Sequence, residues 1–95
     1  MNLIYEKWEE ILEYMRNDLD MTTVSFDTWI KPLKIYNTQG NILRVLVHMD
    51  GAEEYLEKKY KVYLEGAIID VINQRYEIEF VTINQIESES FAKKE

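Results

Sequence analysis

Apolar residues recur at helical spacing at the start of the chain. The apolar positions of this stretch are Ile4, Trp8, Ile11, Leu12, Met15 and Leu19. This spacing predicts an amphipathic helix over residues 3–18, because the glutamates fill the positions between the apolar ones. We interpret the acidic face as an ordinary solvated surface and assign it no site.

A second, shorter helix is predicted in residues 24–33. Its apolar positions share one helical face and are Phe26, Trp29 and Ile30. Ser25 is the expected N-cap, and Pro32 ends the helix because it disfavours helical geometry at Lys31. A helix this short is marginal in water, so we expect tertiary packing to hold it and take it as the centre of the core.

The apolar period then changes from helical to alternating. Leu33 and Ile35 alternate with polar residues, and every second residue from 43 to 47 is apolar. Gly40 and its asparagine neighbours supply the residues of a turn. The sequence therefore predicts a β-hairpin.

A third helix is predicted over residues 52–72. Asp50 and Glu53 have the spacing of a capping box, which places the start of the helix here. A continuous helix of this length would be ~33 Å long. Gly66 lies inside it, and we expect a kink or a close approach by another segment at that position.

The last predicted element is a strand. Tyr76, Ile78 and Phe80 alternate with glutamates, which gives one buried and one acidic face. The order α-α-β-β-α-β indicates one α+β domain over residues 1–82, with helices on one side of three strands. Residues 83–95 are polar, and we expect a flexible tail or the start of an interdomain linker.

Composition narrows the class of protein. The chain has 95 residues, of which 46% are hydrophobic, so it forms a single small domain with a modest core. It contains no cysteine, which excludes disulfides and thiolate zinc sites and fits the cytoplasm. No apolar run is long enough to span a bilayer, and no signal peptide is recognisable, so we expect no membrane association. The net charge of −7 favours a protein partner over a nucleic acid.

Catalytic and cofactor motifs are absent from the sequence. With three glycines and no phosphate-binding loop, the chain has no site for nucleotide hydrolysis. His48 is the only histidine, which excludes metal sites with several histidines. No pair of carboxylates stands apart as a general acid and base. We therefore expect a protein without enzymatic activity, cofactor or metal.

One basic cluster accompanies an aromatic residue. Lys58, Lys59 and Lys61 surround Tyr60, a pattern that can bind single strands weakly. Glutamates at helical spacing before these lysines can pair with them on a solvated face. We favour solvation, and little or no nucleic-acid binding.

The environment of Trp8 has two interpretations. A tryptophan on an amphipathic helix usually belongs to the core. Tyr5 and Trp8 are nevertheless one helical turn apart near a chain terminus, where a protruding aromatic could bind a second molecule. The residues alone favour the core.

Taken together, these segments resemble the N-terminal domain, domain I, of the bacterial replication initiator DnaA. The resemblance covers residues 4–82 and is carried by Trp8, SFDTWIKPL at 25–33, QGN at 39–41, YLEKKY at 55–60 and IEFV at 78–81. It implies a KH-like fold, whose α-α-β-β-α-β order agrees with the periodicity.

The resemblance also implies an assembly module. Domain I of the family self-associates weakly and docks the replicative helicase and regulators of initiation. The first-helix tryptophan is a self-association residue there, so the resemblance implies a partly exposed Trp8, with Tyr5 and Leu12 beside it. The positions that correspond to partner contacts are Ser25, Thr28, Trp29, Met49, Gly51 and Ala52.

Two departures from the family pattern keep alternatives open. Gly51 stands where the family often has an aromatic residue, and Ser25 stands where an acidic residue is common. One alternative is therefore a freestanding domain I homologue that modulates the initiator. Another is a weak single-strand binder that uses the lysine cluster.

Overall fold

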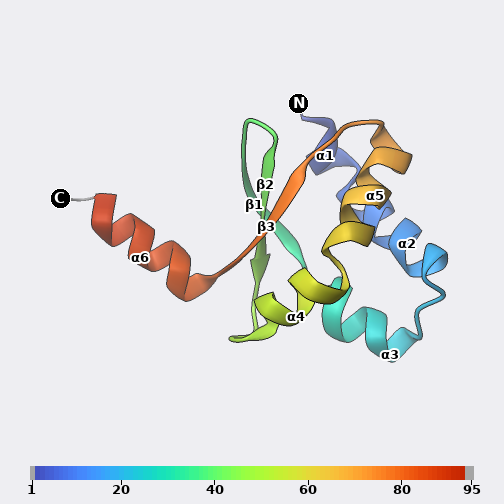
Figure 1. Ribbon diagram of the computed structural model, residues 1–95, viewed down its shortest axis with the longest axis horizontal. Coiled ribbons are helices and arrows are strands. Elements are labelled where there is room, and N and C mark those ends of the chain that lie inside the picture. Colours follow the sequence, from blue (N-terminus) through green and yellow to red (C-terminus); the bar gives the residue numbers. More distant parts are fainter. Residues whose placement is uncertain (1, 94–95) are drawn as a thin grey trace.

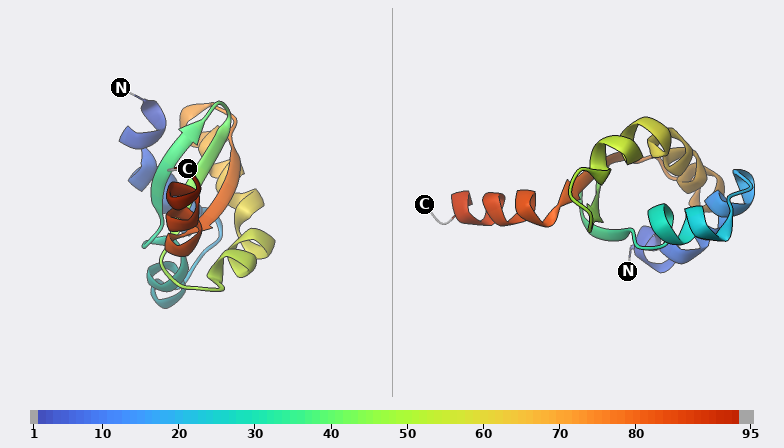
Figure 2. Two further views of the ribbon diagram at one scale, coloured as in Figure 1. Left: turned by 90° about the vertical axis from the view of Figure 1, so that its left-hand side faces the viewer. Right: turned by 90° about the horizontal axis from the view of Figure 1, so that it is seen from below.

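The computed structural model describes the backbone of residues 2–93 and the side chains of residues 2–88. Helices cover one face of a three-stranded sheet, and the last helix leaves from the other side (Figures 1 and 2). In chain order the elements are α1 (Leu3–Glu6), α2 (Trp8–Asp18), α3 (Thr23–Ser25), η1 (Phe26–Ile30), β1 (Lys34–Gln39), β2 (Ile42–Val47), α4 (Ala52–Lys59), α5 (Lys61–Ile72), β3 (Glu77–Thr82) and α6 (Ile83–Lys93). The predicted α+β class and the order of elements are confirmed.

The sheet is mixed, with β2 in the centre. β1 and β2 form the predicted antiparallel hairpin, in which Gly40 adopts a positive φ of 60° at the turn. β3 runs parallel to β2, with Leu43 opposite Ile78 and Val45 opposite Phe80. A parallel neighbour requires a crossover connection, which α4 and α5 supply.

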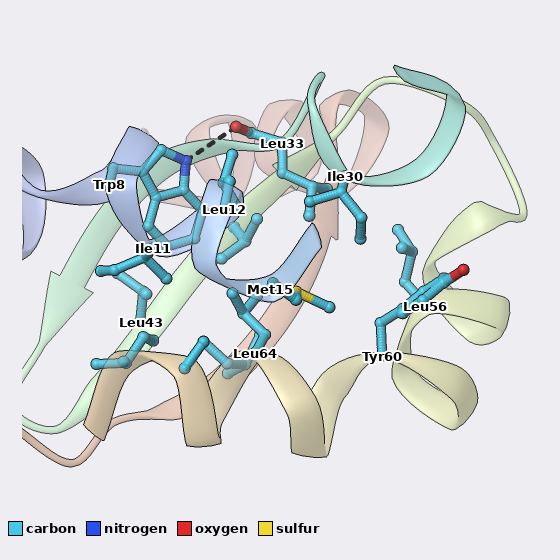
Figure 3. Packing of buried hydrophobic residues seen from close by; sticks show 14 of the residues in the cluster. Trp8, Ile11, Leu12, Met15, Ile30, Leu33, Leu43, Leu56, Tyr60 and Leu64 are labelled. Carbon is cyan, nitrogen blue, oxygen red and sulfur yellow. Dashed lines mark hydrogen bonds between the residues drawn. The ribbon is translucent and has the colours of Figure 1, made fainter. Parts of the chain in front are cut away.

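The core lies between the sheet and the helices. The apolar stripe of α2 points toward the inner face of β2 and toward α5 (Figure 3). The largest side chains with almost no exposed surface are Ile4, Ile11, Met15, Ile30, Leu43, Leu56, Leu64, Ile68, Ile78 and Val45. The short second helix contributes Phe26 and Ile30 to this core, while Trp29 is half-buried at its edge.

The first predicted helix is interrupted at Lys7, so residues 3–18 form α1 and α2 rather than one helix. Lys7 has φ −103° and ψ 9°, outside helical geometry. Its N–H still donates to the Leu3 carbonyl at 3.0 Å, and its carbonyl accepts from the Ile11 N–H at 2.9 Å. The chain therefore changes direction at Lys7, while the backbone N–H and carbonyl of Lys7 both keep their hydrogen-bond partners.

The second helix differs from the prediction at both ends. Thr22, not Ser25, is the N-cap, and its Oγ1 accepts from the Ser25 N–H at 3.1 Å. Lys31 remains helical in spite of Pro32, because its N–H donates to the Phe26 carbonyl at 2.8 Å. This wider bond belongs to the π-helical turn η1, and the chain leaves the helix only after Lys31.

The third predicted helix is two helices that meet at Tyr60. Tyr60 has φ −115° and ψ −16°, and its side chain is buried. The change of direction lets α4 pack on β3 while α5 packs on α2.

Neither expectation for Gly66 is met, because α5 continues through it and a Cβ there would meet nothing within 4 Å. The predicted Asp50 cap is also wrong: Gly51 is the N-cap of α4 and no side chain caps that end.

β3 is confirmed, and a further helix follows it. Residues 83–93 form α6, which projects away from the rest of the fold and contacts it near the end of β3 (Figure 1). Thr82 and Gln85 cap α6 reciprocally, as in a capping box. The Thr82 N–H donates to the Gln85 Oε1 at 2.8 Å, and the Gln85 N–H donates to the Thr82 Oγ1 at 3.3 Å.

The domain boundary at residue 82 stays a prediction, and residues 94 and 95 lie outside the described residues. None of the helices in the described chain has the length and apolar content needed to cross a membrane.

Candidate functional site

A cavity of about 250 Å³ opens between η1 and the start of α4. Its lining is mostly apolar and consists of Thr28, Trp29, Pro32, Leu33, Val47, His48, Met49, Ala52 and Leu56. Four of the residues that the resemblance marks as partner contacts are in this lining, namely Thr28, Trp29, Met49 and Ala52. Segments far apart in the sequence therefore bring most of the predicted contact set to one place.

The two remaining residues of that set do not line the cavity. Ser25 lies one turn earlier, where its N–H is bonded to the Thr22 side chain. Gly51 is exposed and adopts a φ of 86°, a left-handed conformation that L side chains rarely adopt. It forms the sharp turn across which the Ala52 N–H donates to the Met49 carbonyl at 3.2 Å, and both of those residues line the cavity.

An aromatic cluster extends the cavity along α4. The ring centroids of Trp29 and Tyr55 are 4.4 Å apart, and those of Tyr55 and Tyr60 are 6.1 Å apart in an edge-to-face arrangement. The second spacing falls in the favourable range for aromatic pairs, and the first lies at its lower edge. Tyr55 is 38% exposed, so the cluster continues the apolar wall to the surface.

Lys59 is fixed against this cluster. Its Nζ donates to the Tyr55 hydroxyl at 2.9 Å and lies 5.3 Å and 5.5 Å from the centroids of the Tyr55 and Tyr60 rings. The hydrogen bond with Tyr55 is the main cause that raises the pKa of Lys59, while burial is the main cause that raises the pKa of Tyr60. Sequence reasoning treated this lysine as part of a solvated cluster and missed its contacts with the two rings.

The predicted pairing of that lysine cluster with glutamates is wrong. Within the described residues no ion pair joins Glu54 to Lys58 or Glu57 to Lys61. The break at Tyr60 explains the second case, because Glu57 and Lys61 belong to different helices.

Trp8 is a core residue, as the residues alone indicated, and the partly exposed position implied by the resemblance is wrong. It is 7% exposed, and its indole N–H donates to the Leu33 carbonyl at 3.0 Å (Figure 3). Leu12 is also buried. Tyr5 is 45% exposed and is the one member of the predicted self-association set with a large accessible ring.

Trp8 and Leu12 nevertheless reach the surface at the bottom of a groove of about 300 Å³. The groove runs between α2 and the segment that joins η1 to β1. Its lining residues are Trp8, Glu9, Leu12, Glu13, Phe26, Lys31, Leu33 and Lys34. Two apolar hollows thus lie on either side of Leu33, which lines both.

Comparison with known proteins identifies the relatives of this chain. Residues 5–69 match the family described as the DnaA N-terminal domain. The chain is 41% identical over 92 residues to the chromosomal replication initiator protein DnaA of Lachnoclostridium phytofermentans. That match covers 93% of this chain and 20% of the relative, so the chain spans about a fifth of its length.

Proposed function

This chain belongs to the DnaA N-terminal domain family, and on that premise we propose that it is a protein–protein interaction module of a replication initiator. The role is non-catalytic and cytoplasmic. It consists of docking the replicative helicase or regulators of initiation, together with weak self-association. The observation that carries the proposal is the apolar cavity between η1 and α4, which unites four of the expected contact residues.

The cavity has the properties of a docking site for a partner side chain. Binding energy at protein interfaces concentrates in a few apolar or aromatic anchors that enter well-packed pockets. A hollow of about 250 Å³ with an apolar lining can receive such an anchor. Met49, which is 46% exposed at its rim, has a flexible side chain that can adapt to the shape of a partner.

Titration calorimetry with the purified replicative helicase of the same organism tests the docking role. Trp29→Ala removes the largest side chain of the cavity wall, and we expect it to weaken binding by about tenfold or more. Val62→Ser is the matched control, because Val62 is 74% exposed on α5 and does not line the cavity. Equal affinity of the unchanged chain and Trp29→Ala would place the contact elsewhere. Circular dichroism confirms that each variant is folded.

Self-association is tested separately by sedimentation velocity over a range of protein concentrations. We expect the sedimentation coefficient of the unchanged chain to rise with concentration, as for a weak dimer. The groove beside Trp8 is the surface that supports this part of the proposal, because the largely buried Trp8, Leu12 and Phe26 form an apolar floor between charged walls. A coefficient that does not change with concentration would exclude self-association of this chain.

A further inference from the structure

Helix α5 is apolar on every side, although one of its faces is exposed to solvent. Of its twelve residues, the charged ones are Lys61, Glu65 and Asp70. A helix that is apolar all round is usually buried on all sides. Figure 2 shows α5 along the rim of the molecule, with no other described element outside it. One face of this helix is therefore left without a partner.

The uncovered face is centred on Gly66. Val62, Tyr63, Ile69 and Asp70 lie three or four residues from Gly66 and so surround it on the helix surface. Val62 is 74% exposed, Tyr63 is 51% exposed and Ile69 is half-buried. These five residues, which we call the α5 face, form a mostly apolar surface with no side chain at its centre.

Gly66 has no structural reason within the described chain. A glycine inside a helix is less favourable than an alanine, and a Cβ at this position would meet nothing within 4 Å. On an exposed helix face, the missing side chain lets a second backbone approach closely. The close approach by another segment that the sequence predicts here is therefore open to a different molecule.

Carboxylates border the α5 face on the side of α2. The hydrogen bond to Asp70, at 2.7 Å, is the main cause that raises the pKa of Tyr14, and the charge of Asp18 acts in the same direction, so both carboxylates lie beside this tyrosine. Among the described residues neither aspartate forms an ion pair. The border therefore keeps its negative charge.

We propose that the α5 face binds an amphipathic helix of a protein partner, with the apolar stripe of that helix over Gly66 and its basic residues against Asp18 and Asp70. This inference goes beyond the docking proposed above. It adds a second surface, because no residue of the α5 face lines the cavity between η1 and α4.

The shape and the charge of the α5 face select this occupant. A helix presents apolar side chains at the spacing that fits along another helix face, and its flanking lysines and arginines can reach the carboxylates at the border. An acidic helix would be repelled by both aspartates. A second copy of this chain is disfavoured because each copy carries a net charge of −7.

The probe for the test is a synthetic peptide of about 20 residues, with leucine and alanine along one helical stripe and lysine at the other positions. The comparison peptide has glutamate in place of every lysine. The isotope-labelled chain is titrated with each peptide at low salt, and its amide NMR signals are followed. We expect the basic peptide to shift the signals of the α5 face and the acidic peptide to leave them unchanged.

Gly66→Leu is the decisive variant. Because the added side chain meets open space within the chain, the variant folds and its unfolding midpoint in urea is not lowered. The same side chain holds a partner helix away, so we expect the affinity for the basic peptide to fall by about tenfold. Val24→Ser is the control, because Val24 is 76% exposed on α3, outside the α5 face, and we expect it to leave the affinity unchanged.

Asp70→Asn tests the acidic border. Asparagine keeps an acceptor for the Tyr14 hydroxyl but removes the charge. We expect the affinity for the basic peptide to fall by about threefold and to depend less steeply on salt, because the contacts at the border are exposed.

The outcomes separate this inference from the proposed function. It is wrong if the basic peptide leaves the signals of the α5 face unchanged, if both peptides bind equally well, or if Gly66→Leu binds as tightly as the unchanged chain. None of these results touches the docking of the helicase in the cavity, for which Gly66→Leu is expected to keep the affinity of the unchanged chain. A loss of helicase affinity in Gly66→Leu would overturn the separation of the two surfaces.

Discussion

At the scale of single residues, Trp8 combines two tasks that are easily confused. Its ring fills the space between α2 and the strand that follows Pro32, and its N–H satisfies the Leu33 carbonyl. Its remaining exposed surface is at the floor of the groove. A loss of self-association after truncation of Trp8 would therefore report a damaged core as readily as a lost contact.

The core task of Trp8 can be measured on its own. Trp8→Phe keeps an aromatic ring but removes the donor to the Leu33 carbonyl, which lies in a buried environment. We expect the free energy of unfolding to fall by about 1–3 kcal/mol, as for a buried polar group that loses its partner. Urea unfolding followed by circular dichroism measures the change.

Trp29→Phe is the control for that experiment. Trp29 is half-buried, and within the described residues its indole N–H has no hydrogen-bond partner. We expect it to lower the free energy of unfolding by less than about 1 kcal/mol. Equal losses for the two substitutions would mean that the hydrogen bond to Leu33 contributes nothing measurable.

At the scale of elements, two glycines occupy opposite conformational situations. Gly51 begins α4 with a φ of 86°, and no side chain caps that end. Gly66 lies within the continuous helix α5, with open space where a Cβ would be. Backbone geometry therefore requires glycine at the first position and not at the second.

Replacing each glycine by alanine should change stability in opposite directions. Gly51→Ala forces a side chain into the left-handed region, and we expect a loss of about 1–2 kcal/mol in the free energy of unfolding. Gly66→Ala reduces the freedom of the unfolded chain without a clash, and we expect a gain of about 0.5–1 kcal/mol. Urea unfolding of both variants under identical conditions provides the comparison. A loss at Gly66 would show that another segment approaches it after all.

The sequence predicts elements well where periodicity reports burial directly. The stripe of α2, the alternation of β2 around Leu43 and that of β3 around Ile78 all match the buried face of the structure. The breaks at Lys7 and Tyr60 could not be predicted in the same way. Helical spacing continues across both positions. At Tyr60 the break accompanies a change of neighbour, because α4 packs on β3 and α5 on α2, whereas α1 and α2 both pack on α5 and their contacts do not explain the break at Lys7.

The helix ends were predictable in part. Thr82 and Gln85 have the spacing of a capping box, and this signal would have indicated α6. The same signature at Asp50 and Glu53 was misleading. A glycine in a left-handed turn between them makes the start of α4 without any side-chain cap.

The candidate site was predicted only through the resemblance to the family. Thr28, Trp29 and Met49 are individually unremarkable in the sequence, and only the fold brings them around one cavity. Val47 and Leu56 complete the wall of the cavity. Periodicity cannot tell them from ordinary core residues, because the face of each element that lines the cavity is also the face that packs in the core.

At the scale of the whole molecule, the helical layer is tied together across the surface as well as through the core. The Tyr14 hydroxyl on α2 donates to the Asp70 carboxylate on α5 at 2.7 Å. The two residues are 56 positions apart in the sequence, so this bond joins the first and the last parts of the helical layer. It forms only when the tyrosine is protonated, which makes the link sensitive to alkaline pH.

The sign of that sensitivity follows from linkage. The hydrogen bond to Asp70 is the main cause that raises the pKa of Tyr14 above its ordinary value of 10.0, and the negative charges of Asp70 and Asp18 act in the same direction. A group whose pKa is higher in the folded state contributes stability that is complete below the unfolded value. That contribution is lost as the pH rises through the folded value.

Tyr14→Phe should therefore be less stable than the unchanged chain near neutral pH, and the difference should shrink as the pH rises past about 10. Urea unfolding at a series of pH values measures it. Lys59 and Tyr60 also have raised pKa values, so their contributions to stability are lost as the pH rises as well. These losses are common to both proteins and cancel in the comparison.

Tyr63→Phe is the control, because Tyr63 is 51% exposed and its hydroxyl has no hydrogen-bond partner in the described part of the chain. A difference for Tyr14→Phe that stays constant with pH would show that the hydroxyl contributes through packing and not through its proton.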